Sequence, residues 1–426
     1  MHLSLFFRYK FVRISKNVMR VYRMQNKFIN RRTFLETAAK STAAAAMLGT
    51  TGLRSQPKSE VADIDASRLP RWRGFNLLEK FIASNSNKPF QESDFAMIHE
   101  LGFDFVRLPM SYLCWTDPND WRALKEDKLK EIDLAVGFGK QYGVHVSINF
   151  HRGPGYSVVR SKEEPFNLWL DREARKAFNY HWKHFAERYK GIPNTELSFN
   201  LLNEPATITS ARVSVVSEQT YVDVVRGAVE TIRRVDANRL IIADGLWWGR
   251  DPVAGLIDLH VAQSARGYEP MQVSHYGASW VYGGETWPAP TWPLHQTEAA
   301  ELRWESPVLI QAYKKKLAEW GIPPEMEWNK ERLKRQLIDP WKTLERKGVG
   351  VHVGEYGAFN HTPHDVVLAW LRDLQSLWKE AGWGSAMWNF RGGFGILDSE
   401  RSDVQYEDFR GHKLDRKMLE VLNEFK

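Results

Sequence analysis

The chain of 426 residues has one cysteine, Cys114, so it cannot form an intrachain disulfide. It has no clear membrane-spanning segment, because the stretch at 37–53 is short, only weakly hydrophobic and interrupted by Lys40. It also lacks a basic excess beyond its first 58 residues: these hold twelve Lys or Arg and one acid, which leaves residues 59–426 at −4 within an overall charge of +7. We therefore expect no nucleic-acid partner and no stable membrane anchor.

The basic N-terminal segment has the pattern of a targeting sequence. Residues 30–36, Asn-Arg-Arg-Thr-Phe-Leu-Glu, resemble a twin-arginine export signal and precede the alanine-rich stretch. We expect an export leader at 1–53, with Met24 as an alternative start, and a polar linker at 54–71. The protein would then act in the periplasm or outside a bacterial cell. The alternative is a disordered basic tail.

Tryptophan is abundant, with 18 residues. Such a number suggests exposed aromatic surfaces, on which the apolar face of a sugar ring can stack, although buried core aromatics are the competing interpretation.

From residue 72 onward, short apolar runs alternate with longer amphipathic stretches, which is typical of a parallel α/β fold. Eight runs and their helices predict one (β/α)8 TIM barrel over 72–426, with the chemistry at the carboxyl ends of the strands. The predicted strands are 72–78, 103–109, 144–150, 195–203, 239–245, 272–278, 349–355 and 383–390.

Two glutamates end predicted strands, Glu204 on the fourth and Glu355 on the seventh. Side-chain alternation groups Glu204 with residues 198, 200 and 202, and Glu355 with residues 349, 351 and 353, so both carboxylates would face the barrel lumen. Cleavage of a glycosidic bond requires two carboxyl groups that flank the bond.

Five motifs lie at or near the ends of predicted strands: Val106-Arg107-Leu108-Pro109, Asn149-Phe150-His151-Arg152, Leu201-Leu202-Asn203-Glu204-Pro205, Gly354-Glu355-Tyr356-Gly357 and Met387-Trp388-Asn389-Phe390. By these motifs and their order the chain resembles glycoside hydrolase family 5, the cellulase-like family of clan A, over about 72–400. One position departs from the pattern: the family usually has a histidine and a tyrosine two apart on strand six, whereas His275 and Tyr276 are adjacent and Tyr282 is the next tyrosine. We expect Tyr276 to take the tyrosine role.

The resemblance implies a retaining hydrolase of a β-linked glucan, mannan or related oligo- or polysaccharide, with Glu204 as acid/base and Glu355 as nucleophile. The same residues would serve a transglycosylase, and a barrel that only binds carbohydrate is a further alternative. No metal or other cofactor is expected, and His181 and His184, three apart on a predicted helix, are interpreted as helix surface. The remaining implied roles are Arg107 and Tyr276 beside the nucleophile, Asn203 on the sugar 2-hydroxyl, His151 and His275 on sugar hydroxyls or Glu204, and Trp388 under the reacting sugar.

The connection at 279–306 contains several tryptophans and three prolines, so a long helix is not expected there. Trp280, and less directly Trp287 or Trp292, is predicted to line the cleft beside the reacting sugar. The alternative is that these side chains only pin the loop to the barrel.

Overall fold

A computed structural model describes residues 64–84, 86–158, 164–208, 214–281, 283–295, 307–323 and 325–426. Residues Val61–Lys426 form one compact unit. The predicted export leader and residues 54–63 of the predicted linker lie outside the described residues, as do Tyr282 and Trp304. In the part of the chain that the structure describes, no helix combines the length and apolar character needed to cross a membrane.

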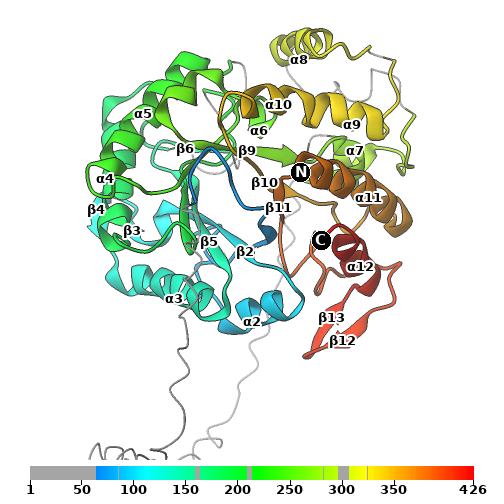
Figure 1. Cartoon of the computed structure of the whole chain (residues 1–426), viewed down its shortest axis with the longest axis horizontal. Helices are drawn as coiled ribbons and strands as arrows, with labels where there is room; N and C mark the ends of the chain where they lie inside the picture. Colours follow the sequence, from blue (N-terminus) through cyan, green and yellow to red (C-terminus); the bar gives the residue numbers. More distant parts are fainter. Residues whose placement is uncertain are drawn as a thin grey trace, which may run out of the picture. The chain divides into compact units, whose positions relative to one another are not determined.

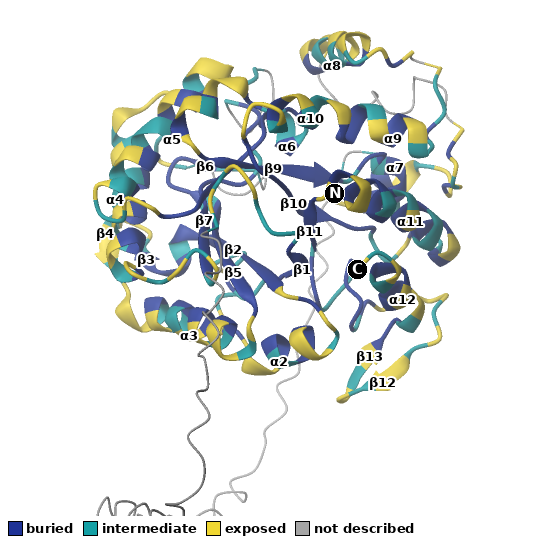
Figure 2. Ribbon diagram, viewed as in Figure 1, coloured by how far each residue is buried: buried dark blue, intermediate teal, exposed yellow. Residues whose placement is uncertain are grey.

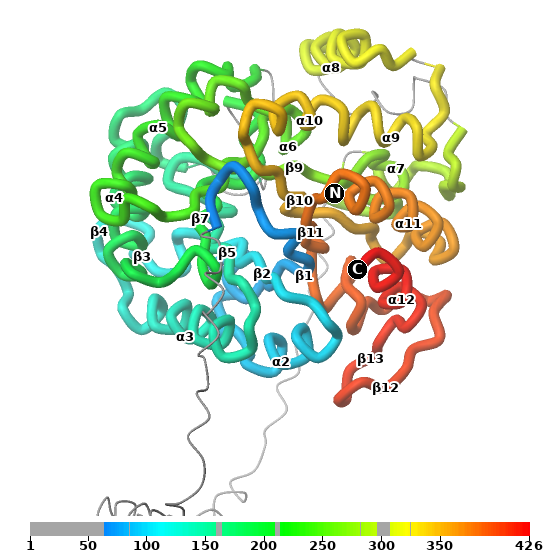
Figure 3. The backbone as a smooth tube through the Cα atoms, viewed as in Figure 1, coloured from blue at the N-terminus to red at the C-terminus, as the bar shows by residue number. Residues whose placement is uncertain are grey.

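Eight parallel strands close into a barrel, which confirms the predicted fold class. Each strand pairs with its neighbours in parallel, and the β2–β5 pairing joins the two sides of the sheet. Figure 3 shows the first strand beside the last, where Arg73 pairs with Ser385. The strands are β1 (Arg73–Asn76), β2 (Phe105–Ser111), β5 (His145–Gly153), β7 (Leu197–Asn200), β8 (Ile241–Asp244), β9 (Ala262–Gly267), β10 (Val351–Tyr356) and β11 (Gly384–Met387).

Helices surround the barrel, as Figure 1 shows. Their inner faces and the strands are buried, whereas their outer faces are exposed (Figure 2), as expected for amphipathic helices that cover a parallel sheet. The helices are α2 (Glu92–Glu100), α3 (Glu126–Tyr142), α4 (Arg172–Arg188), α5 (Glu218–Arg233), α6 (Leu246–Gly249), α7 (Met271–Ser274), α8 (Pro307–Glu319), α9 (Lys330–Leu337), α10 (Asp339–Glu345), α11 (His364–Ala381) and α12 (Arg416–Glu424).

Smaller elements decorate the loops. Two of them are antiparallel hairpins, β3 with β4 and β12 with β13, and β6 extends β5 as a short antiparallel arm. Their bounds are β3 (Thr116–Asp117), β4 (Asp120–Leu124), β6 (Tyr156–Ser157), β12 (Glu407–Phe409) and β13 (His412–Leu414), with 3-10 turns η1 (Tyr112–Cys114), η2 (Ala254–Leu259) and η3 (Gly284–Thr286).

The prediction for strand six was wrong. The segment 272–278 was expected to be a strand, but it contains most of α7, and the sixth strand of the barrel is β9, ten residues earlier in the chain. The β9 sequence, Ala-Gln-Ser-Ala-Arg-Gly, has no large apolar residue, whereas each of the other barrel strands has at least one. Its polar side chains face the lumen, so the usual signal of an apolar run is missing.

Histidines away from the catalytic face are structural. His145 stacks on Trp72 with ring centroids 3.7 Å apart and contacts the Ser198 hydroxyl at 2.9 Å. His181 is fully buried, and its Nδ1 accepts a hydrogen bond of 3.3 Å from Trp115 Nε1. The interpretation of His181 as helix surface is therefore wrong, because the inner face of α4 carries it into the helix–barrel interface.

Candidate active site

Glu204 and Glu355 lie in the same region of the lumen, but the backbone places each of them there in a different way. Glu204 follows β7, whose Asn200 faces the lumen and contacts Arg107, as side-chain alternation predicted. On β10 the alternation is interrupted, because the pairing with β9 shifts register between Val353 and Glu355. The bulge moves Glu355 to the lumen side, while Val353 packs in the hydrophobic core.

Glu355 is held by two cations and a hydroxyl. Its Oε1 accepts a 2.6 Å hydrogen bond from Arg107 Nη1 and lies 3.4 Å from Arg266 Nη2, and its Oε2 accepts a 3.1 Å hydrogen bond from the Tyr268 hydroxyl. The side chain is only 4% exposed, so these contacts act with little screening by water. Each carboxylate oxygen of Glu355 therefore faces a cation or a hydroxyl donor.

Arg107 connects the nucleophile strand to three asparagines. Besides Glu355, its guanidinium donates to Asn76, Asn200 and Asn203 at 3.0, 2.8 and 2.7 Å. Burial lowers the pKa of Arg107, and the Glu355 carboxylate opposes that effect. The predicted position of Arg107 beside the strand-seven glutamate agrees with these contacts.

Glu204 has a different environment. Its Oε1 accepts a 2.9 Å hydrogen bond from Arg266 Nε, and its backbone N–H donates to Asp244 Oδ2 at 2.9 Å. Burial, followed by the Glu355 carboxylate, raises the pKa of Glu204 to about 8, against the opposing effect of Arg266. The side chain is still 13% exposed, so it can meet a substrate. This raised pKa favours the protonated form of Glu204.

The backbone around Glu204 is strained. Glu204 has a φ of 49°, and Trp247 and Trp248 in the next strand's loop have φ values of 55° and 59°. These conformations are unfavourable for residues with a Cβ, and they concentrate at functional sites. The two segments touch through a 3.4 Å hydrogen bond from Trp248 N–H to the Pro205 carbonyl. The strain therefore lies directly beside the acid candidate.

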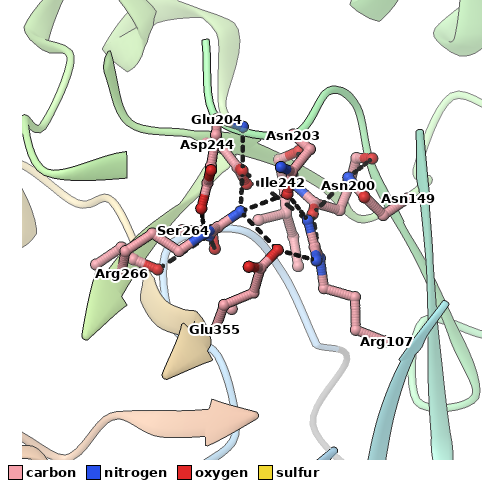
Figure 4. Close-up of polar contacts among 12 residues, drawn as sticks. Arg107, Asn149, Asn200, Asn203, Glu204, Ile242, Asp244, Ser264, Arg266 and Glu355 are labelled. Atoms are coloured by element: carbon pink, nitrogen blue, oxygen red, sulfur yellow. Dashed lines mark hydrogen bonds and ion pairs between the residues drawn. The ribbon is translucent and has the colours of Figure 1, made fainter. Parts of the chain in front are cut away.

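Arg266 and Asp244 form the centre of the site, and the sequence analysis missed both. Arg266, near the end of β9, contacts both glutamates and pairs closely with Asp244 at the end of β8 (Figure 4). Both side chains are almost completely buried. The Asp244, Glu355 and Glu204 carboxylates raise the pKa of Arg266 above its ordinary value, although burial by itself would lower that pKa.

The tyrosine beside Glu355 is Tyr268, which corrects the expectation for Tyr276. Tyr276 follows α7, away from the end of strand six, and His275 also lies outside that strand. His275 stays near the site, with its ring 5.1 Å from that of Tyr268, but the side chain of strand six that binds Glu204 is Arg266. Arg266 and Tyr268 are two apart, which is the spacing expected of the missing pair.

His151 and Trp388 form a second group at this face. Their ring centroids lie 5.5 Å apart, and Phe81 contacts both, at 4.4 Å from His151 and 5.3 Å from Trp388. Burial and the charges of Arg107 and Arg266 hold the pKa of His151 well below its ordinary value. His151 is therefore a neutral imidazole, which can both donate and accept a hydrogen bond.

Asn203 precedes Glu204 and is oriented by the two arginines. Its Oδ1 accepts hydrogen bonds of 2.7 Å from Arg107 and 2.9 Å from Arg266. Its Nδ2 is buried, and no described residue accepts a hydrogen bond from it. The amide is thus fixed with its donor group available.

The tryptophans of the loop after β9 differ from one another. Trp280 is 57% exposed and makes edge contacts with Phe359 and His275, at centroid distances of 4.7 and 6.2 Å. Trp292 instead packs against the core and donates from Nε1 to Asp373 on α11 at 2.8 Å. Trp280 therefore presents an open ring, whereas Trp292 pins the loop.

Across the described residues, no group of three histidine, cysteine, aspartate or glutamate side chains is placed to hold a metal ion. A (β/α)8 barrel with two carboxylates at the carboxyl ends of its fourth and seventh strands has the arrangement of a glycoside hydrolase. A family model described as Cellulase (glycosyl hydrolase family 5) matches residues 62–393. The chain belongs to glycosyl hydrolase family 5, a family of retaining O-glycosyl hydrolases.

Individual relatives agree with the family. The chain is 26% identical over 324 residues to Endoglucanase C of Acetivibrio thermocellus, a match that covers 74% of this chain and 88% of that protein. It is 24% identical over 304 residues to Cellodextrinase A of Ruminococcus flavefaciens, with 68% and 76% covered.

Solved structures share the fold. A crystal structure described as a glycoside hydrolase superposes with a TM-score of 0.73 at 35% identity, over 84% of this chain and 99% of the other. Cel5A of Thermotoga maritima in complex with mannotriose gives a TM-score of 0.58 at 21% identity, over 83% and 97% of the two chains. At that identity the second likeness shows the fold alone.

Proposed function

We propose that the protein hydrolyses β-linked glucans by double displacement, with Glu355 as the nucleophile and Glu204 as the acid/base. The observation that carries this assignment is the asymmetry between the two carboxyl groups around Arg266. The two oxygens of Glu355 accept hydrogen bonds from Arg107 and Tyr268, whereas burial and the neighbouring carboxylates favour the protonated form of Glu204. Two carboxyl groups in opposite protonation states are what the first step of a retaining mechanism requires.

In the first step, Glu355 attacks the anomeric carbon as the glycosidic C–O bond breaks, and the Glu204 proton moves to the leaving oxygen. Glu355 becomes an uncharged ester, which removes the negative charge that helps to keep Glu204 protonated. Glu204 can then take a proton from the water that attacks the anomeric carbon, and Glu355 leaves as a carboxylate. Both glutamates end in their starting states.

The other side chains bind the sugar. Asn203 donates its free Nδ2 to the 2-hydroxyl, a contact that strengthens in the transition state. His151 binds a neighbouring hydroxyl as a neutral group, and Trp388 supports the apolar face of the reacting sugar. His275 packs its ring against that of Tyr268 and so helps to position the hydroxyl that donates to Glu355.

The substrate class is tested by a panel of β-glucan, mannan and xylan polymers together with aryl β-cellobiosides and β-mannobiosides. The relatives named endoglucanase and cellodextrinase support β-glucan as the preferred substrate. We expect hydrolysis of β-glucan and the aryl cellobioside, with the β-anomer appearing first in proton NMR spectra of the products. A product mixture dominated by longer oligosaccharides would instead assign the barrel to transglycosylation, and a lack of any product from the whole panel would contradict the proposal.

Trp280 is proposed as a sugar platform beside the site. Changing Trp280 to Ala should lower kcat/KM on oligosaccharides. The expected loss corresponds to about 1–3 kcal/mol of transition-state stabilisation, by analogy with base–aromatic stacking. The melting temperature should change little, because the ring is 57% exposed. Kinetics on aryl cellobiosides and longer cello-oligosaccharides, measured beside a melting curve, test this prediction.

Trp292 supplies the matched control, since it lies in the same loop but packs inward. Trp292→Ala should cost about 3–5 kcal/mol of stability, the scale of large-to-small changes in a core. Its kinetics below the melting transition should stay close to those of the parent. If Trp280→Ala melted early and bound oligosaccharides normally below its midpoint, Trp280 would be a packing residue.

The N-terminal leader is proposed to direct export through the twin-arginine route. Changing Arg31 and Arg32 together to Lys should leave the protein in the cytoplasm of a bacterial host, because the route reads the arginine pair. Cell fractionation followed by immunodetection measures the distribution, and a change of Arg54 to Lys, outside the motif, serves as the control. Undiminished export of the Arg31/Arg32 variant would show that the protein uses another route.

A further inference from the structure

The Arg266–Asp244 pair has contacts that go beyond holding two strands together. Every nitrogen of the Arg266 guanidinium faces a polar acceptor of the site or of β9 itself. Nε donates to Glu204 Oε1, Nη1 to Ser264 Oγ and the Ala265 carbonyl, and Nη2 to Asn203 Oδ1 and Asp244 Oδ2. The guanidinium is therefore locked in one orientation.

This orientation distinguishes the two oxygens of Glu204. An arginine N–H can only donate, so the Oε1 that receives it must act as an acceptor. When Glu204 is protonated, its proton then resides on Oε2, the oxygen to which no described residue donates. Arg266 thus determines which oxygen of the acid delivers its proton.

An arginine this close would normally drive Glu204 to ionise, and Asp244 is placed to prevent that. Asp244 is fully buried, pairs closely with Arg266 and accepts hydrogen bonds of 2.9 Å from the Glu204 backbone N–H and 2.8 Å from Asn200 Nδ2. With Asp244 and Glu355 ionised, two carboxylates balance Arg107 and Arg266, so the site is neutral only while Glu204 keeps its proton.

The balance also holds after the first step. Once Glu355 is esterified it carries no charge, and an ionised Glu204 takes its place against the two arginines. The charged and titratable groups that act on Glu204 are Arg266 and Tyr268 from the β9 region, Asp244 from β8 and Glu355 from β10. Arg107 from β2 pairs with two of these groups, Glu355 and Asp244.

We propose that Arg266 and Asp244 are a positioning pair for the acid/base, in which Arg266 directs the Glu204 proton to Oε2 and Asp244 cancels the charge of Arg266. This inference rests on the proposed role of Glu204. Neither residue needs to touch the substrate.

The test is the alkaline limb of the pH profile of kcat/KM on an aryl β-cellobioside, which should lie near pH 8 in the parent enzyme. Asp244→Asn leaves Arg266 uncancelled and should move the limb down by about one pH unit or more. Arg266→Met should move it up by a similar amount, because Asp244 is then unopposed. The double variant should return the limb to within about half a unit of the parent, because the charge of the pair is zero in both.

A second readout separates the effect of the Arg266 Nε hydrogen bond on the Glu204 proton from the effect of the Arg266 charge. Loss of the Arg266 donor should reduce kcat/KM about tenfold or more on substrates with poor leaving groups, and much less on activated aryl glycosides. Arg266→Lys keeps the charge but not the Nε donor. It should show the same larger loss on poor leaving groups, while the alkaline limb of its kcat/KM profile stays at the pH of the parent. If the single variants do not fold, the double variant carries the test: an equal loss on both leaving-group classes would overturn the proposal.

A third readout does not depend on turnover. In protein labelled with carbon-13 at the glutamate carboxyl groups, the Glu204 signal, assigned by its absence in Glu204→Gln, should titrate in the same order across the variants. The inference would be overturned if both single variants kept the parent's alkaline limb of kcat/KM and the parent's titration of the Glu204 signal. The proposed function would remain intact in that case. A parent enzyme that hydrolyses none of the substrates would defeat the proposed function, and the titration would still judge the pair.

Discussion

Glu355→Ala is expected to lose turnover on every substrate, whatever the leaving group. Without this carboxylate no glycosyl–enzyme intermediate can form, and losses of about 10⁴-fold or more accompany removal of such a nucleophile. Arg107 and Arg266 would also lose an anionic partner at 2.6 and 3.4 Å, so the variant should melt earlier. Initial rates on an activated aryl β-cellobioside and on β-glucan measure the effect.

Glu355→Gln keeps the shape of the side chain and should be equally inactive, which separates chemistry from packing. Asp133→Asn removes a carboxylate that pairs with Arg188 in the helix layer and should retain activity. Azide added to Glu355→Ala should yield the α-glycosyl azide, because the small anion attacks directly from the vacated side. A 2-fluoro glycoside should label Glu355 in the parent, and stable labelling at another residue would refute its role.

Glu204→Ala is expected to discriminate sharply between substrates. Hydrolysis of β-glucan should fall by about 10²–10⁴-fold, the usual contribution of a general acid. Dinitrophenyl glycosides need little protonation, so their kcat/KM should change far less. Their kcat should still fall, because the water that attacks the intermediate has lost its base, and KM should fall with it as the intermediate accumulates.

Azide should restore turnover of the activated glycosides by Glu204→Ala and give a β-glycosyl azide, with retained configuration. Glu204→Gln is the matched control, since its amide oxygen can still accept from Arg266 Nε and the backbone at φ 49° is unchanged. It should show the same dependence on the leaving group with a melting temperature closer to the parent. An equal loss on good and poor leaving groups in both variants would count against the acid/base assignment.

Glu204 and Glu355 are coupled electrostatically through one guanidinium. Arg266 contacts Glu355 and Glu204 together, so the loss of either glutamate changes the charge that the other experiences. Removal of the Glu355 charge should lower the pKa of Glu204, since that carboxylate is the second largest cause of its elevation. The titration of Glu204 in Glu355→Gln should therefore move toward lower pH.

The sequence determined the barrel and the positions of its two glutamates. Apolar runs separated by amphipathic stretches specify strands and helices through local periodicity, and parallel strands place their carboxyl ends at one face. Glu204 and Glu355 lie at the ends of such runs, and Arg107 and His151 lie within two others. These residues could be found because short-range patterns carry the information.

Only the tertiary structure identified strand six and the groups it contributes. The β9 strand, Ala262–Gly267, is too polar for an apolar run to reveal, because Ser264 and Arg266 point into a polar lumen. The Arg266-x-Tyr268 spacing is the one signal in the sequence that could have located β9. It has an arginine where the family pattern has a histidine, so the pattern does not match there. Tyr276 was expected in this role because it lies near the end of the segment 272–278, which was predicted to be strand six.

Glu355 shows the same limit within a correctly placed strand. Alternation predicted that it shares a face with Val351 and Val353, yet a register shift separates Glu355 from them. A bulge depends on how neighbouring strands pair across the barrel, and that pairing leaves no trace in local sequence. Likewise, the exposure of Trp280 and the inward packing of Trp292 follow from contacts with Phe359 and Asp373, about 80 residues away in the chain. The sequence by itself thus determined the elements and the chemical groups at their ends, while long-range pairing and packing decided which groups meet and which of them carry a proton.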